Sequence, residues 1–207
     1  MQRLAWSGIL APLLRLGLIL LLGVLHPDYS QTRDFISELG APDAPFPAVM
    51  NLLGIALVGL LLVVFSVPLR RAQPPGPLGT AGSLLLAISG VAFVAVGLLP
   101  CDQPGCSSTS PSAVMQGHLV AGLTAMTTQT LSALAFGLRL FSGTGPRWYA
   151  VTSLALGLAA LLALALLFGT GLRLPAPGIA QKAMQFSVDI WVFVSAVALL
   201  RARRSDA

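Results

Sequence analysis

Six long apolar runs limit what this chain can fold into more than any other feature of its sequence. Each run is about 20 residues or longer, which is the length that an α-helix needs to cross roughly 30 Å of hydrocarbon. The runs cover approximately residues 4–25, 47–69, 78–99, 113–140, 148–168 and 179–200. Proline and glycine occupy the links, as is typical of helix ends. The sequence therefore predicts an all-α membrane protein, a six-transmembrane-helix bundle that forms a single domain over residues 1–207.

The composition argues against the main alternatives to a membrane bundle. Hydrophobic residues make up 56% of the chain and charged residues only 9%, whereas a soluble domain has about a quarter charged residues. We expect no nucleic-acid partner, because such a partner requires a clustered basic patch. The first run is long enough to span and no small-residue cleavage pattern follows it, so we interpret it as a helix rather than a signal peptide.

The distribution of Lys and Arg predicts the orientation of the bundle. One side would carry Arg3, Arg70, Arg71, Arg139, Arg147, Arg201, Arg203 and Arg204, and the other Arg33, Arg173 and Lys182. Because cytoplasmic loops are enriched in Lys and Arg, both termini are expected to be cytoplasmic. The loop after the first helix and the loop CDQPGCSSTSPS after the third helix would then face outward.

The first outer loop, HPDYSQTRDFISELGAPDAPFP over residues 26–47, concentrates ionisable groups in an otherwise apolar chain. We expect it to fold over the outer face of the bundle, where Asn51 and His118 lie just inside their helices and Asp102 follows the third helix. Ionisable groups near lipid are costly and often functional. An outer pocket is therefore predicted, lined by His26, Asp34, Glu38, Asp102 and His118.

Three kinds of site stay open for this pocket. The candidates for a hydrolase or acyltransferase are a base (His26 or His118), a carboxylate that orients it (Glu38 or Asp102) and a nucleophile (Ser37). The same histidines and carboxylates would suit a divalent metal such as zinc. An anionic lipid headgroup would bind Arg33 and Lys182, with Asp34 and Asn51 as further binding candidates. The structural alternative is that SELG forms a short helix with Ser37 as its N-cap and Gly40 as its stop.

The two cysteines, Cys101 and Cys106, both lie in the second outer loop. An oxidising outer face permits a disulfide, and the Pro and Gly between the cysteines make the turn easy, so we expect the pair to be bonded. The alternative is a thiol pair that binds metal. Two cysteines at this spacing without a second pair are a weak zinc signal.

Two charged residues fall near the middle of their runs, Arg15 in the first and Asp189 in the sixth. A lone charge at that depth costs roughly 2.5–3.5 kcal/mol on insertion scales. Opposite signs at matching depth therefore predict an ion pair that places these two helices side by side, either for packing or as a proton or substrate relay. Alternatively, Arg15 snorkels toward the cytoplasm.

In the fourth run, a stripe of small and polar residues indicates close helix packing or a lined cavity: His118, Gly122, Ala125, Gln129 and Ser132.

Several motifs together resemble one bacterial membrane family. They are HPDYSQTRDFISELGAPDAPFPAVMNLLG after the first run, LLPCDQPGC after the third and GHLVAG in the fourth. They are similar to the six-helix family catalogued as domain of unknown function 998, which implies a bacterial inner membrane location. Late in the chain, GIAQK places Lys182 where that family tends to have Arg. A more distant similarity to the Frag-type eukaryotic six-helix family, which includes autophagy modulators and GPI-lipid remodelling factors, implies lipid handling.

These observations leave three classes of function open. The leading expectation is a lipid-associated membrane protein with a polar pocket at its outer face. The alternatives are a membrane-embedded hydrolase or transferase that acts on a lipid or lipid-linked substrate, and a structural or regulatory subunit of a membrane complex. Membrane lipid is the expected partner, with a membrane protein or a second copy of the chain as the partner in the third class. A divalent metal at the outer face is the cofactor that the candidate ligands would take.

Overall fold

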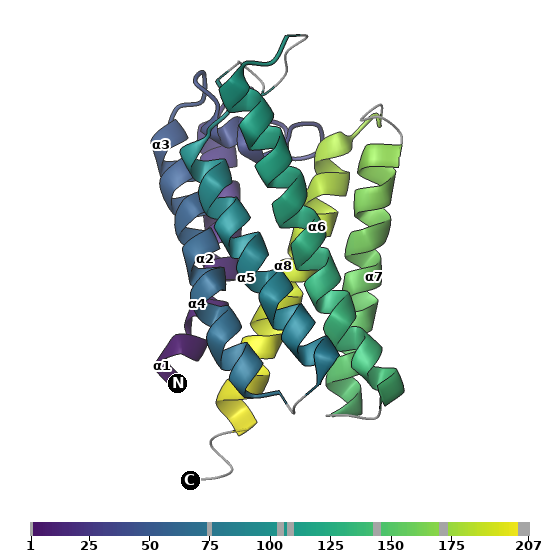
Figure 1. The fold of residues 1–207 in the computed structure, drawn as a ribbon. Coiled ribbons are helices and arrows are strands. Elements are labelled where there is room, and N and C mark those ends of the chain that lie inside the picture. The colour runs from purple at the N-terminus through teal and green to yellow at the C-terminus, as the bar shows by residue number, and fades with distance from the viewer. Residues whose placement is uncertain are drawn as a thin grey trace.

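The computed structural model describes residues 2–73, 76–102, 106, 110–142, 146–169 and 174–202. Every regular element within these residues is helical (Figure 1). Six helices are long and apolar enough to cross a membrane: Arg3–Leu25, Pro47–Arg71, Pro77–Leu98, Ala113–Arg139, Arg147–Gly169 and Pro177–Ala202. The structure thus confirms the predicted all-α six-helix bundle, and the chain is an integral membrane protein.

Several helical elements build two of the six spans. The first span contains α1 (Gln2–Ala5) and α2 (Ser7–Leu25), and the second contains α3 (Pro47–Val49), the π-helical η2 (Met50–Leu57) and α4 (Val58–Arg71). Single helices form the others: α5 (Pro77–Leu98), α6 (Ala113–Ser142), α7 (Arg147–Gly169) and α8 (Pro177–Ala202). Proline opens α3, α5 and α8, because the first helical position needs no N–H donor.

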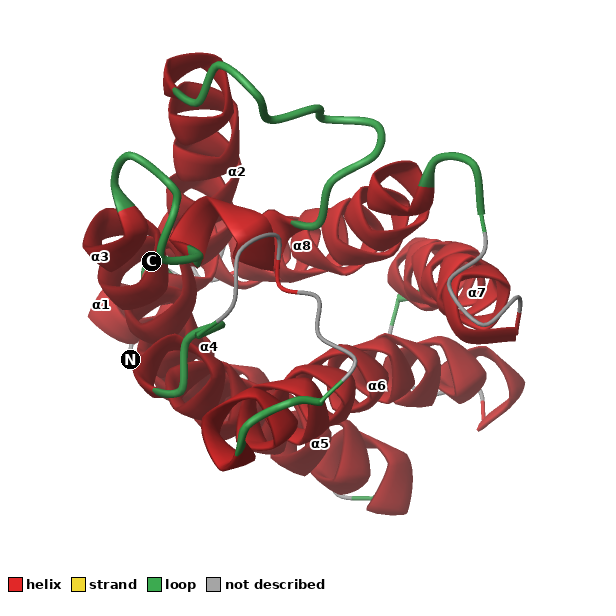
Figure 2. Ribbon diagram, turned by 90° about the horizontal axis from the view of Figure 1, so that it is seen from above, coloured by secondary structure: helices red, strands yellow, loops and turns green. Residues whose placement is uncertain are grey.

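The six spans form a closed ring in chain order. Consecutive spans contact each other, and α2 closes the ring through contacts with both α4 and α8. Figure 2 shows this arrangement along the axis of the bundle. Because the number of spans is even, Gln2 and Ala202 lie at the same end (Figure 1). We call this the terminal end, and the opposite end, which carries residues 26–46, the first-loop end.

Small residues let neighbouring spans approach closely. Gly59 of α4 and Gly90 of α5 face each other, and a Cβ atom on Gly59 would lie 2.5 Å from the Gly90 carbonyl oxygen. Between α5 and α6, the Ser89 hydroxyl donates to the Ala125 carbonyl (2.9 Å), and the Ser132 hydroxyl donates to the backbone of α5 (2.6 Å). Ala125 and Ser132 of the small and polar stripe on α6 therefore serve helix packing, as is usual between membrane helices.

The polar first loop packs over the first-loop end of the bundle. Its short 3₁₀ helix η1 (Ile36–Gly40) buries Ile36 and Leu39, which join the same apolar core as side chains of α2 and η2. The second loop approaches the same place, because the Cys101 Sγ lies 3.9 Å from the Ser37 carbonyl oxygen. The loop residues 26–46 therefore form a roof over the helices rather than a free connection.

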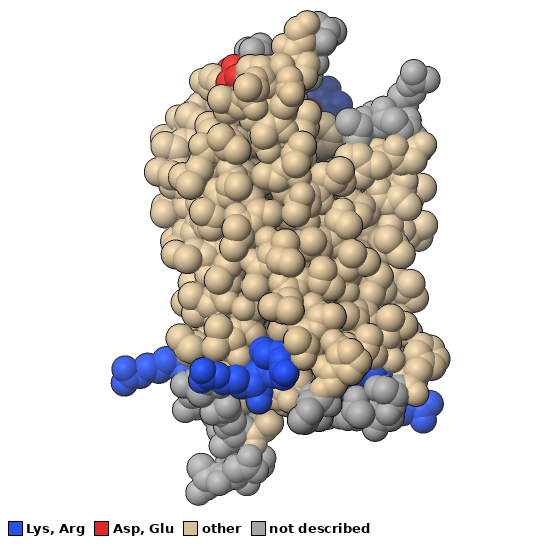
Figure 3. Space-filling model, viewed as in Figure 1, with Lys and Arg blue, Asp and Glu red and all other residues tan. Residues whose placement is uncertain are grey.

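Charged side chains separate between the two ends. The described basic residues of the terminal end are Arg3, Arg70, Arg71, Arg139, Arg147 and Arg201, which form the blue band in Figure 3 where that view exposes them. The first-loop end holds Asp28, Asp34, Glu38, Asp43 and Asp102 together with Arg33 and Lys182. Arg173, Arg203 and Arg204, which the orientation prediction also used, lie outside the described residues.

Candidate functional site

The first loop is fastened to the beginning of α8. Backbone N–H groups in the first turn of α8, those of Gly178 and Ile179, donate to the carbonyls of Arg33 (3.1 Å) and Thr32 (3.0 Å). The first N–H groups of a helix need such outside acceptors. A Cβ atom on Gly178 would lie 2.4 Å from the Asp34 carbonyl oxygen, so the close approach of loop and helix requires glycine.

Two side chains of α8 strengthen this attachment. Gln181 accepts a hydrogen bond from the Ile36 N–H (2.7 Å), and the Lys182 Nζ donates to the Asp34 carbonyl (2.7 Å). Lys182 is only 7% exposed, and its Nζ lies 5.0 Å from the centre of the Tyr29 ring. A single carbonyl oxygen needs one donor rather than the planar fork of Arg. Lys182 therefore holds the backbone of the roof.

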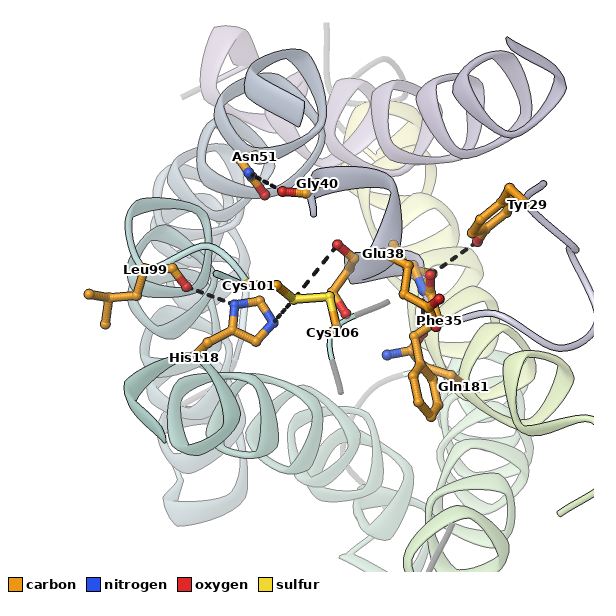
Figure 4. Close-up of a disulfide and its surroundings, with 12 residues drawn as sticks. Tyr29, Phe35, Glu38, Gly40, Asn51, Leu99, Cys101, Cys106, His118 and Gln181 are labelled. Atoms are coloured by element: carbon orange, nitrogen blue, oxygen red, sulfur yellow. Dashed lines mark hydrogen bonds between the residues drawn. A yellow bond between two sulfur atoms is a disulfide. The ribbon is translucent and has the colours of Figure 1, made fainter. Parts of the chain in front are cut away.

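The expected SELG helix is present as η1, with a different start. The Glu38 carboxylate accepts a hydrogen bond from the Phe35 N–H (2.7 Å), so Glu38 rather than Ser37 caps the helix. Ser37 lies inside η1, and Gly40 is its last residue rather than the residue after it. The Asn51 side-chain amide donates to the Gly40 carbonyl (2.8 Å; Figure 4), which ties the roof to η2.

Burial perturbs two titratable groups of the loop. The pKa of Glu38 is raised mainly because burial disfavours its charged form; the Phe35 N–H opposes the shift and the Asp34 charge adds to it. The pKa of Tyr29 is raised by burial, and the charges of Glu38 and Asp34 raise it further. The Tyr29 hydroxyl donates to the Phe35 carbonyl (3.2 Å). These groups are part of the folded loop and not a solvated charge cluster.

His118 lies buried next to Leu99 and Cys101. Its Nδ1 is 2.8 Å from the Leu99 carbonyl oxygen, so Nδ1 carries the proton that is donated, and Nε2 is the acceptor of the neutral form of the ring. Cys101 and Cys106 form a disulfide, and the Cys101 Sγ is 3.8 Å from the His118 Nε2. Figure 4 shows the disulfide between the His118 ring and η1. Cys101 therefore lies close to the His118 ring of α6.

The other candidate residues are dispersed around the first-loop end. Asp102 is exposed and accepts a hydrogen bond from the Ser112 hydroxyl, just before α6. The centre of the His26 ring lies 6.1 Å from that of the Tyr29 ring. The Arg33 side chain is 67% exposed, and its Nε lies 3.9 Å from the Asp34 carboxylate. Among the described residues, no three His, Cys, Asp or Glu side chains come close enough to hold a metal ion. The four metal candidates are therefore not brought together.

A cavity of about 380 Å³ lies between α6, α7 and the roof, and we call it the side cavity. Its volume falls within the range of ligand sites. Most of its lining is apolar; the polar members are Ser37, His118 and Gln181. Leu123 and Met126 of α6 and Phe168 of α7 belong to the apolar wall. Of the five residues expected to line the outer pocket, His118 lines the side cavity. The other four line neither the side cavity nor the smaller cavity described next: His26, Asp34, Glu38 and Asp102.

A smaller cavity of about 60 Å³, the inner cavity, continues toward the middle of the bundle. It shares Ser37, His118 and Gly122 with the side cavity and reaches Arg15 and Gln185. The Arg15 Nη2 is buried and has no hydrogen-bond partner among the described residues. A buried donor of this kind is rare and favours an acceptor group beside it. The two cavities together offer an apolar wall that leads to a polar inner end.

Arg15 and Asp189 meet at that inner end. The Arg15 Nη1 lies 3.0 Å from one carboxylate oxygen of Asp189 and 3.4 Å from the other, and both side chains are buried. The amides of Gln185 (3.2 Å) and Gln129 (3.5 Å) also donate to Asp189. The guanidinium lies 4.2 Å from the centre of the Phe93 ring. Arg15 therefore contacts α8 and α5 and does not extend toward the terminal end.

Two glutamines of α8, Gln181 and Gln185, are candidate site residues that the sequence analysis did not select. Gln181, Gln185 and Asp189 recur at every fourth position, which places all three on one face of the helix. Gln181 binds the roof and lines both cavities, and Gln185 lines the inner cavity and binds Asp189. Gln185 and Gln181 lie four and eight residues before Asp189, whose charge was predicted to lie within the membrane. This regular spacing was the signal in the sequence that could have identified them.

Comparisons with known proteins place the chain in a family but not beside a characterised relative. No curated protein and no solved structure matches it. A family model described as a protein of unknown function, DUF998, matches residues 9–198. This range runs from the beginning of α2 almost to the end of α8 and includes every residue of both cavities at the first-loop end. The chain therefore belongs to the DUF998 family of proteins of unknown function.

Proposed function

We propose that this protein is a lipid-binding protein of the bacterial inner membrane, with both termini in the cytoplasm. In this orientation the first-loop end faces outward, and the side cavity lies at the depth of the outer leaflet. The distribution of the described charges supports the orientation, because basic residues gather at the terminal end and acidic residues at the first-loop end. The proposed activity is to hold one lipid, with an acyl chain in the side cavity.

The observation that carries the proposal is the side cavity itself, about 380 Å³ in volume and mostly apolar. Its walls include Leu119, Leu123 and Phe168, which are 52%, 47% and 43% exposed and so also face the surrounding hydrocarbon. A chain can therefore enter from the side, without passing through the roof. The polar groups of Ser37, His118 and Gln181 would meet the more polar part of the lipid.

The inner cavity supports a preference for an uncharged oxygen. Arg15 and Asp189 form a neutral pair, so the site has little net charge to attract an anion. The Arg15 Nη2 nevertheless has no hydrogen-bond partner among the described residues, and Arg15 is one of the residues that line the inner cavity. An ester or amide carbonyl or a hydroxyl would accept it, because buried donors in low-dielectric surroundings are stabilised by a partner.

A cavity-filling variant tests the proposal. A Cβ atom on Gly122 would have one neighbour within 4 Å, at 4.0 Å, so Gly122→Leu should fill the cavities without disturbing the helices. Gly17→Leu is the matched control, because Gly17 lies on the outer face of α2 with nothing within 4 Å. In native mass spectrometry of gently extracted protein, Gly122→Leu should retain one lipid fewer than wild type and Gly17→Leu. Equal lipid retention by all three proteins would contradict the proposal.

Acyl hydrolysis or transfer is the second candidate, and the orientation of His118 favours it. The Leu99 carbonyl fixes the ring so that Nε2 can accept a proton, and Ser37 lines the same two cavities. Ser37 would attack an ester carbonyl, and His118 would take the hydroxyl proton and pass it to the departing alcohol, which leaves the acyl group on Ser37. The disulfide between the His118 ring and η1 would have to move aside for the two side chains to meet. A fluorophosphonate probe should then label wild type but not Ser37→Ala or His118→Gln, with Ser30→Ala as the control. Absence of labelling on folded wild-type protein would rule this candidate out.

A further inference from the structure

A third cavity lies at the terminal end of the bundle, at the opposite end from the proposed lipid site. Its volume is about 310 Å³, and it is enclosed by the ends of α4, α6, α7 and α8. The lining residues that matter here are Leu69, Phe136, Arg139, Trp148, Tyr149 and Leu199. Among the described residues that line it, Arg139 is the one charged member. We call this the terminal cavity.

The aromatic wall of the terminal cavity is held in place. The Tyr149 hydroxyl lies 2.7 Å from the Ser195 Oγ, which itself donates to the Trp191 carbonyl (2.7 Å). The Tyr149 ring packs edge-on against Phe136 (centroids 6.2 Å apart) and Trp148 (5.7 Å). A wall that is already ordered loses little conformational entropy when a ligand binds. The cavity is therefore preformed.

Positive charge dominates this end of the molecule. Arg139 is only 6% exposed, so its guanidinium is largely withdrawn from water beside the apolar lining. Arg147 and Arg201 are each adjacent in sequence to lining residues, and both are exposed. Among the described residues, no Asp or Glu lies at this end; Figure 3 shows blue but no red there on one face. The terminal cavity is therefore suited to an anionic group.

Trp148 indicates the depth of the cavity in the bilayer. It is 54% exposed and lies at the beginning of α7, next to Arg147. Trp and Tyr are enriched at the level of the lipid headgroups, and basic pockets between helices at the cytoplasmic side bind the headgroups of anionic lipids. The cavity thus combines an apolar interior with a basic rim at headgroup depth.

We propose that the terminal cavity binds one anionic phospholipid from the leaflet at that end. The phosphate would accept hydrogen bonds from Arg139, whose planar fork matches phosphate oxygens. Part of one acyl chain would lie against Phe136 and Leu199. The proposal does not depend on the lipid site at the first-loop end, because no residue lines both places.

The test is native mass spectrometry of delipidated protein titrated with phosphatidylglycerol or with phosphatidylcholine of the same chains. Wild type should bind phosphatidylglycerol more tightly, and Arg139→Gln should weaken that binding by about fivefold or more. Arg3→Gln is the matched control, because it removes the same charge from the same end without touching the cavity. It should bind as wild type does.

A second variant covers the case in which Arg139→Gln fails to fold. Ala198→Phe would fill the cavity and leave Arg139 in place, since Ala198 is a small, half-buried lining residue. It should also lose the preference for phosphatidylglycerol over phosphatidylcholine while Gly122→Leu keeps that preference, which separates this site from the side cavity. Equal binding of the two phospholipids by wild type, or wild-type binding by Ala198→Phe, would overturn the proposal.

Discussion

Replacing Arg15 with methionine should destabilise the bundle strongly, because the change leaves the Asp189 carboxylate buried without its cation. Asp189 would keep only the amide donors of Gln185 (3.2 Å) and Gln129 (3.5 Å). Removal of one partner from a buried ion pair costs about 3–5 kcal/mol. Because two amide donors remain, we expect the lower end of that range, about 3 kcal/mol.

Two further variants make this prediction specific. Arg33→Met removes an exposed cation that lies 3.9 Å from its partner, so it should cost less than about 1 kcal/mol. The double variant Arg15→Met/Asp189→Leu removes both buried charges and should recover most of the stability lost in either single variant.

Reversible unfolding by SDS in mixed micelles, followed by circular dichroism, gives the free energy of unfolding for each protein. The decisive quantity is the coupling between the two sites, which a double-mutant cycle isolates. If the loss in the free energy of unfolding of the double variant equals the sum of the losses in the two single variants, the Arg15–Asp189 contact does not stabilise the bundle and the reasoning is wrong.

Three other perturbations have defined outcomes. Glu38→Gln keeps the acceptor that caps η1 and removes a half-buried charge. The folded-state pKa of Glu38 is raised, so its protonated side chain contributes to the stability of the fold at low pH, and this contribution is lost as the pH rises through that pKa. The variant should therefore have a higher melting temperature than wild type near about pH 8 but not near about pH 4. Replacement of Cys101 and Cys106 by serine should lower the free energy of unfolding by about 2 kcal/mol, measured by the same SDS titration. The effect is small because the bridged residues are separated by only 5 positions. Gly59→Ala should cost about 1–3 kcal/mol because its Cβ would meet the backbone of α5 at 2.5 Å, whereas Gly17→Ala should be neutral in that assay.

The sequence predicts the helices of this protein well because lipid permits few alternatives. A span must satisfy its own backbone hydrogen bonds, so an apolar run of sufficient length can only be helical. The prediction of which helices are neighbours came from the same physics. Arg15 and Asp189 have opposite charges at matching depth, and the structure places them 3.0 Å apart between α2 and α8.

The candidate site was harder to predict, because polar residues of a loop can bind backbone as readily as a ligand. Asp34, Glu38 and Lys182 were selected for their charge, yet each makes a backbone hydrogen bond within the roof. Such contacts depend on where the loop lies relative to α8, which no local pattern reveals. The side cavity depends on Gly122 and on the ends of α6 and α7, and thus on packing between elements distant in sequence.

Photo-crosslinking tests the central claim, that an acyl chain occupies the side cavity, most directly. The probe is a phospholipid with a diazirine near the end of one acyl chain, incorporated into membranes that contain the protein, with peptide mapping after irradiation. We expect adducts on Leu123, Met126 and Phe168, which line the cavity. Adducts spread equally over outward residues such as Val91 and Leu162, which are 61% and 62% exposed, would show only bulk lipid contact and contradict the claim.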